Sequence, residues 1–100
     1  MLLMDKVCII AGAASLRSIG YATAEMFVEH GAKVVVTDVS MNSDVLESIK
    51  NSIEKQLQRS IFIDGIQCDI SKKEACDALV AEVVRLHGRV DCMVNSAGIV

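Results

Sequence analysis

The 100-residue chain has no proline or tryptophan, a single tyrosine and no excess of positive charge. It also has no low-complexity tract and no linker-like stretch, so it has material for one domain only. A net charge of -3 with scattered basic residues offers no basic face to nucleic acid. No apolar run is long enough to cross a membrane. These absences argue against nucleic-acid and membrane partners.

The N-terminus has one feature of a secretory signal, because Met1–Lys6 precede an apolar run that ends in small residues. Asp5, however, stands where a signal carries positive charge, and the apolar run is short. We therefore interpret the run as a buried first strand and expect a cytoplasmic protein.

The four cysteines, at positions 8, 68, 76 and 92, form no C-x-x-C pair and have no ligand-like spacing to a histidine. This pattern predicts reduced thiols in or near the core and no metal site. His30 and His87 each precede a glycine, which is typical of helix ends rather than of ligands or general bases.

The first half of the chain predicts a βαβ unit. A strand beginning at Val7 leads into a helix that ends at Gly31, with an apolar face at Ile19, Thr23, Met26, Phe27 and His30. The β-branched run Lys33–Asp38 then predicts a strand buried on both faces of a parallel sheet.

The alternation continues to the end of the chain. A second helix carries the apolar stripe Leu46, Ile49, Ile53 and Leu57, and Ile61–Ile70 predicts a strand with a bend or bulge near Asp64 and Gly65. Ser71 and Glu74 form a potential capping box for a third helix, whose stripe is Ala75, Leu79, Val83 and Leu86, before Gly88. Val90–Asn95 predicts a fourth strand. The fold class is therefore α/β, with a Rossmann-type doubly wound parallel sheet.

The turn between the first strand and first helix resembles a phosphate-binding loop. Gly12 can adopt a conformation closed to other residues, and Gly20 lets the helix start approach a pyrophosphate. Free amides of the first helical turn point at the same place. Seven residues separate the two glycines, so the loop alone fits a plain turn as well as a dinucleotide site.

Asp38 strengthens the dinucleotide interpretation. It ends the second strand at the carboxyl edge, eighteen residues beyond Gly20, near the spacing at which an acid meets the adenosine ribose. Its carboxylate would accept both ribose hydroxyls and repel a 2′-phosphate, whereas Arg17 could pair with one. We expect NAD rather than NADP; the other interpretation is an aspartate that only caps its turn.

These residues resemble the short-chain dehydrogenase/reductase family over essentially the whole chain. Cys68-Asp69-Ile70 resembles its adenine contact, and Asn95-Ser96-Ala97-Gly98 resembles its Asn-Asn-Ala-Gly motif, preceded by a matching fourth strand. Together, the loop and the resemblance assign these cofactor-binding residues: Gly12, Ser15, Arg17, Ser18, Ile19, Gly20, Asp38, Val39, Asp69, Ile70, Asn95, Ala97 and Gly98.

Two departures from the family pattern concern the substrate. Ala11 replaces the usual threonine, the loop is two residues longer, and Ser18 stands at the middle glycine, as in the divergent branch of enoyl-acyl-carrier-protein reductases. Asp38 and the motif that starts at Asn95 instead resemble the main branch. Ser96 for asparagine is a small change if Asn95 makes the structural bond.

The resemblance implies catalysis by a serine and a Tyr-x-x-x-Lys pair, which this chain lacks. Its one tyrosine, Tyr21, is followed four positions later by Glu25. We therefore expect residues 1–100 to be the N-terminal portion of an NAD(P)-binding domain in a longer homo-oligomeric protein, with the fourth strand as an apolar edge.

Two functions of different class fit. One is the cofactor-binding part of an oxidoreductase that interconverts a hydroxyl and a carbonyl of a small molecule, or reduces an enoyl thioester. The other is a non-catalytic nucleotide-binding or sensor module, since fold does not determine function.

Overall fold

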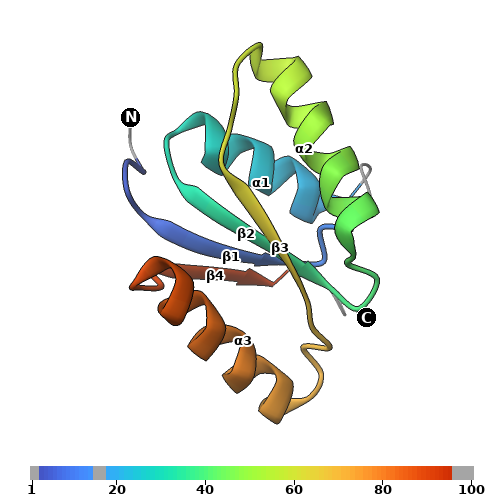
Figure 1. Ribbon diagram of the computed structural model, residues 1–100, viewed down its shortest axis with the longest axis vertical. Coiled ribbons are helices and arrows are strands. Elements are labelled where there is room, and N and C mark those ends of the chain that lie inside the picture. The colour runs from blue at the N-terminus through green and yellow to red at the C-terminus, as the bar shows by residue number, and fades with distance from the viewer. Residues whose placement is uncertain (1–2, 15–17, 96–100) are drawn as a thin grey trace.

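The computed structural model describes residues 3–14 and 18–95. Strands and helices alternate along the chain (Figure 1), in the order β1 (Val7–Ala11), α1 (Ile19–Glu29), β2 (Lys33–Asp38), α2 (Ser43–Leu57), β3 (Ile63–Gln67), α3 (Lys73–His87) and β4 (Cys92–Asn95). Every predicted element is present, and β2 has the predicted bounds. The strands β3 and β4 are shorter than predicted.

The four strands form one parallel sheet in the order β3-β2-β1-β4. Figure 1 shows α1 and α2 on one face of the sheet and α3 on the other. The predicted Rossmann-type α/β fold is thus confirmed, and its strand order reverses between β1 and β4, where such sheets bind ligands.

The two central strands carry the core. All five residues of β1 are buried, as are Val34, Val35 and Val36 of β2. Alternate side chains enter two separate clusters, one under α1 and α2 and the other under α3. Continuous β-branched runs form these strands because both faces of each are covered.

The buried face of α1 differs from the prediction. Gly20, Ala24 and Val28 face the sheet, whereas Ile19 and Met26 are 76% and 56% exposed. Phe27 of the predicted face is only partly buried. Small side chains at the contact let the helix axis lie close to the strands, and this packing overrides the stripe of larger residues.

The capping box predicted for α3 is wrong. The helix begins at Lys73, and Lys72 at its N-cap position makes no side-chain capping bond. Ser71 instead donates its hydroxyl to Asp69 Oδ1 over 2.6 Å. Leu86 also departs from its predicted place, since it is 47% exposed while Leu79 and Val83 are buried.

The predicted bulge in β3 is also wrong, because Asp64 and Gly65 pair in regular register with Val35 and Val36. The glycine has a packing role instead. A Cβ on Gly65 would lie 3.1 Å from Leu46 Cδ1 and 3.2 Å from Met41 Sδ. Its missing side chain is what lets α2 approach the sheet.

We expect Gly65→Val to lower the free energy of unfolding by about 1–3 kcal/mol, because the added methyl groups overpack this contact. Gly88→Ala is the matched control: Gly88 has φ +85° but nothing within 4 Å of a Cβ, so only conformational strain of about 1 kcal/mol arises. Urea denaturation measures both. A smaller loss for Gly65→Val than for Gly88→Ala would contradict the close approach of α2.

Both histidines lie at helix ends, as predicted. His87 is the last residue of α3, and its ring meets Phe62 edge-on, with centroids 5.4 Å apart. Its Nε2 lies 3.7 Å from Asp64 Oδ2. All four cysteines are free, with Cys8 and Cys68 buried, in agreement with the predicted thiols.

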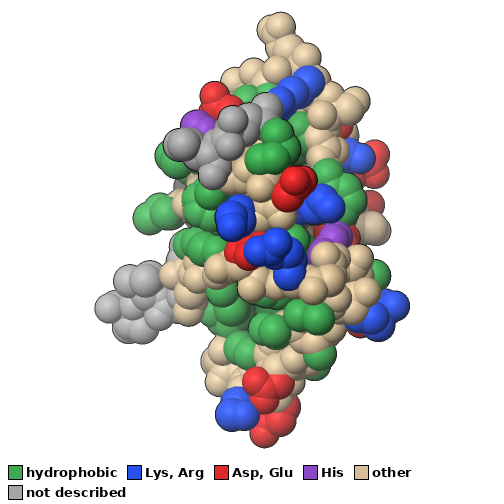
Figure 2. All heavy atoms as spheres, turned by 90° about the vertical axis from the view of Figure 1, so that its left-hand side faces the viewer, with side chains coloured by type: hydrophobic (Ala, Val, Ile, Leu, Met, Phe, Trp, Pro, Cys, Tyr) green, Lys and Arg blue, Asp and Glu red, His purple; other side chains and the backbone are tan. Residues whose placement is uncertain are grey.

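The side of the molecule that bears the amino ends of the strands carries acidic and basic side chains next to one another (Figure 2). Arg89 pairs with Asp91 there, and Asp91 Oδ2 accepts a bond from the Val7 amide over 2.8 Å. Both contacts lower the pKa of Asp91, and the bond from the Val7 amide contributes more than the bond from Arg89. The carboxylate thereby joins the starts of β1 and β4.

Within residues 3–14 and 18–95, no helix is long and apolar enough to span a membrane. The same part of the chain contains no group of three or more side chains that could hold a metal ion.

Candidate dinucleotide-binding site

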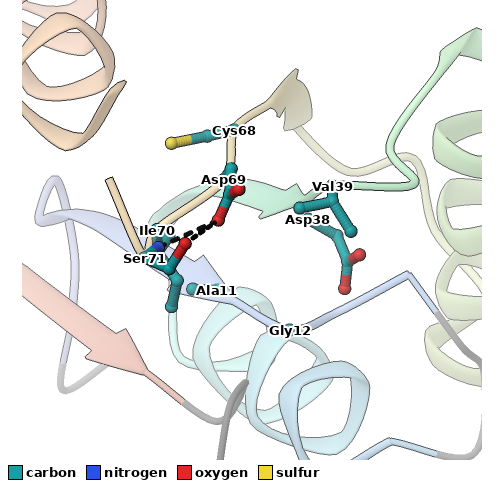
Figure 3. A pocket seen from close by; sticks show the side chains of 8 residues that line it. All are labelled: Ala11, Gly12, Asp38, Val39, Cys68, Asp69, Ile70 and Ser71. Carbon is teal, nitrogen blue, oxygen red and sulfur yellow. Dashed lines mark hydrogen bonds between the residues drawn. The ribbon is translucent and has the colours of Figure 1, made fainter. Parts of the chain in front are cut away.

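A cavity of about 230 Å³ opens where the carboxyl ends of β1 and β2 meet the loop after β3 (Figure 3). Its lining comes from three strand ends: Ala11, Gly12, Asp38, Val39, Cys68, Asp69, Ile70 and Ser71. Five of the predicted binding residues are therefore together: Gly12, Asp38, Val39, Asp69 and Ile70. Parallel strands bring them together because their carboxyl ends share one edge.

Gly12 makes the turn that leaves β1. Its φ is 84°, a left-handed conformation that favours glycine, and its amide donates to the Thr37 carbonyl over 2.9 Å. This bond ties the loop to the end of β2. The backbone is thus held at the pocket without a side chain in the way.

The first turn of α1 begins at the same edge of the sheet. Ser18 is the N-cap residue, and its Oγ accepts a bond from the Tyr21 amide over 2.9 Å. The hydroxyl therefore satisfies one amide of the helix start. Gly20 is buried and Ile19 is exposed. None of Ser18, Ile19 and Gly20 is among the residues that line the cavity.

Asp38 provides the acid at the end of β2. Its Oδ1 accepts the Ser40 amide over 3.0 Å, which orients the carboxylate, and its backbone carbonyl accepts the Cys68 amide over 3.2 Å. A partly exposed carboxylate on a pocket wall can accept hydroxyl groups and disfavours a second negative charge.

Asp69 provides a second acid from the loop after β3. Its Oδ1 accepts both the hydroxyl and the amide of Ser71, over 2.6 and 3.0 Å. The Ser71 hydroxyl, followed by its amide, lowers the pKa of Asp69. The loop is therefore an Asx turn that keeps the carboxylate charged beside the pocket.

The other predicted residues divide into two groups. Asn95 pairs in register with Ala11 and so lies at the same edge of the sheet, outside the cavity lining. Ser15, Arg17, Ala97 and Gly98 lie outside the described residues.

Ala11, Cys68 and Ser71 also line the pocket, although only Cys68 belongs to a segment that the family resemblance had singled out. Ser71 had a recognisable signal, because Asp-x-Ser is a common Asx-turn pattern, but the competing capping-box pattern hid it. Cys68 stands in the Cys68-Asp69-Ile70 segment that resembles the adenine contact, but only Asp69 and Ile70 of that segment were assigned to the site.

Tyr21 lies away from this pocket. Its hydroxyl is 2.7 Å from Ser52 Oγ, and its ring packs against the core cluster under α1 and α2. The tyrosine joins two helices, as expected for a partly packed helix residue.

A glycine in the left-handed conformation, a helix start and two acids at the carboxyl edge of a parallel sheet define a nucleotide-binding protein of the Rossmann type. A family model described as enoyl-(acyl carrier protein) reductase matches residues 12–100. The chain belongs to the short-chain dehydrogenase/reductase family.

Two curated relatives illustrate the match. An uncharacterized short-chain type dehydrogenase/reductase of Sinorhizobium fredii is 36% identical over 99% of this chain and 38% of its own length. The NAD-dependent glycerol dehydrogenase of Listeria innocua is 39% identical over 95% of this chain and 34% of its own. The chain thus spans little more than a third of these relatives.

Solved structures agree. A short-chain dehydrogenase from Mycobacterium smegmatis superposes with a TM-score of 0.79 at 33% identity, covering 98% of this chain and 39% of that one. A metagenomic short-chain oxidoreductase in complex with NADP gives a TM-score of 0.80 at 30% identity, over 99% of this chain and 42% of that one.

Proposed function

We propose that this chain binds NAD and forms the cofactor-binding part of an oxidoreductase that interconverts a hydroxyl and a carbonyl group of a small molecule. The observation that carries the proposal is the Asp38 carboxylate on the wall of the Gly12 pocket, at the carboxyl end of β2. The nicotinamide of the bound cofactor would supply or accept the hydride.

The described residues suggest separate roles in holding the cofactor. Gly12, Ser18 and Gly20 would leave room and amides for the pyrophosphate. Asp38, with Val39 beside it, would accept the ribose hydroxyls, and Asp69 with Ile70 would contact the adenine. Asn95 would support the carboxyl edge of the sheet near the nicotinamide end of the cofactor. These roles draw on the carboxyl ends of all four strands.

The names of the relatives favour an enzyme over a sensor module, since they include dehydrogenases and reductases. An enoyl-thioester reductase is the second candidate, favoured by the description of the matching family model and by Ser18-Ile19 in the loop. An assay of a protein that carries the catalytic residues, with a panel of alcohols and an enoyl thioester, distinguishes a hydroxyl–carbonyl oxidoreductase from an enoyl-thioester reductase.

We also propose a cytoplasmic location and a homo-oligomeric parent protein. Four free cysteines support a reducing compartment. Size-exclusion chromatography with light scattering, on the longest natural form of the protein, tests the oligomer.

We expect NADH to bind about tenfold more tightly than NADPH, because the Asp38 carboxylate on the pocket wall would repel a 2′-phosphate on the adenosine ribose. Asp38→Ala should narrow this difference, and Asp38→Asn, which keeps the size and an acceptor, should narrow it nearly as much. Fluorescence titration with both cofactors measures the effect. An exposed acid on α2, Asp44, provides the control Asp44→Ala. Equal or tighter NADPH binding by the unmodified chain contradicts the proposal and points to Arg17.

A further inference from the structure

The fold brings the four cysteines together in two pairs that the sequence spacing does not reveal. Cys8 and Cys92 are register partners on β1 and β4. Cys68 follows β3, and Cys76 lies in the first turn of α3, where its Sγ is 3.3 Å from the carbonyl oxygen of Ile70, two residues beyond Cys68. The second pair adjoins the pocket.

Cys68 belongs to the pocket wall. Its side chain is 6% exposed, and Figure 3 shows its sulfur pointing away from Asp38 and Val39. Cys68 also contributes to the core cluster under α3. A movement of this side chain would therefore change both the shape of the pocket and the packing of α3.

Cys76 is the more accessible partner. It is only partly buried, and its Sγ donates to the Ile70 carbonyl over 3.3 Å. Ile70 lines the pocket next to Asp69. The Cys76 thiol thus helps to hold the loop whose carboxylate and apolar side chain face the pocket.

We propose that Cys68 and Cys76 are a redox modification site, at which a reversible disulfide forms and weakens dinucleotide binding to the adjoining pocket. The disulfide itself follows from the placement of the two thiols. Its effect on the cofactor rests on the proposed function.

The oxidant we assign is a low-molecular-weight disulfide. Cys76 as thiolate attacks one of its sulfurs, which breaks that S–S bond, forms a mixed disulfide and releases one thiolate. Cys68, after losing its proton to solvent, attacks the Cys76 sulfur and releases the second thiolate. The released thiolates take up the two protons. The protein thiols lose two electrons, and the small disulfide gains them as two thiols.

The Cys8–Cys92 pair should react more slowly than the Cys68–Cys76 pair. Cys8 is 1% exposed, and burial raises its pKa to about 11, with a further contribution from Cys92. Few thiolates form there near neutral pH. Burial also raises the pKa of Cys68, and the second step is intramolecular in either pair. Cys68 lies on the pocket wall, however, whereas Cys8 is enclosed within the fully buried strand β1.

The disulfide would alter the pocket in two ways. It removes the thiol hydrogen that Cys76 donates to Ile70. It also draws Cys68 toward α3, because an S–S bond is only about 2 Å long. Asp69 and Ile70 lie between the two cysteines and would shift with them.

The test treats the chain with oxidised glutathione, maps disulfides by mass spectrometry, and titrates each oxidised protein and its own reduced form with NADH. We expect the Cys68–Cys76 crosslink to form before any Cys8–Cys92 crosslink. The crosslinked protein should bind NADH about tenfold more weakly, and a dithiol reductant should restore the original affinity. Cys76→Ser keeps a hydroxyl donor toward Ile70 and cannot crosslink, so its affinity should not respond to glutathione. Cys92→Ser removes the other pair and should respond like the unmodified chain.

The outcomes separate this inference from the proposed function. Absence of the crosslink overturns the inference, whether or not NADH binds. A crosslink with unchanged NADH affinity also overturns it. If the protein forms the crosslink on oxidation but binds no dinucleotide in its reduced form, the modification site stands and the proposed function is refuted.

Discussion

Replacement of Gly20 by valine is expected to abolish dinucleotide binding, with a loss of affinity of at least about a hundredfold. Gly20 is a buried residue in the first turn of α1. A branched side chain there would occupy the space that a pyrophosphate needs next to the helix amides. Titration with NADH, alongside circular dichroism to follow the helices, measures the effect.

Ala22→Val is the matched control, since it adds the same kind of branched side chain at an exposed position of α1. It should leave NADH affinity nearly unchanged. Ser18→Ala should lower the stability of α1 by about 0.5–2 kcal/mol, because it removes the N-cap bond to the Tyr21 amide. If Gly20→Val binds NADH as well as Ala22→Val does, the loop is only a turn and the binding proposal fails.

The 100-residue chain is expected to show no dehydrogenase turnover even when NAD is bound. Its one tyrosine is engaged with Ser52 between α1 and α2, and Glu25 rather than lysine follows it four positions later. No residue pair of the kind that the family resemblance implies can therefore exchange a proton with a substrate oxygen, a step worth about 10²- to 10⁴-fold in rate. Absorbance of NADH with a panel of alcohols measures turnover.

A titration of the same sample with NADH shows whether the inactive protein binds cofactor. Addition of the residues that follow in a longer relative, as a fused segment containing Tyr-x-x-x-Lys, should restore turnover. Turnover by the 100-residue chain that disappears in Tyr21→Phe would identify Tyr21 as the proton donor, and the family-based interpretation of catalysis would be wrong.

Local patterns predicted the parts of the fold that depend on neighbours in sequence. The run of β-branched residues in Lys33–Asp38 specifies a strand buried on both faces, and the stripe of Ile49 and Ile53 specifies the buried face of α2. The pattern failed for α1, where the larger residues Ile19 and Met26 are exposed and small ones are buried. Helix periodicity reveals an apolar stripe but not how closely a helix must approach its sheet.

The candidate site shows the same division. By itself, the sequence determined that strands and helices alternate and that acids follow the second and third strands, because hydrophobic runs and turn residues act over a few positions. Asp38 and Asp69 were assigned to one site through the family resemblance, and the tertiary structure shows both on the wall of one pocket. Only the tertiary structure decided that Gly65 makes room for α2, that Cys8 and Cys92 are register partners, and that Cys76 bonds to the loop that contains Cys68. Those contacts join residues from different elements, and only the parallel register of the strands brings such residues together.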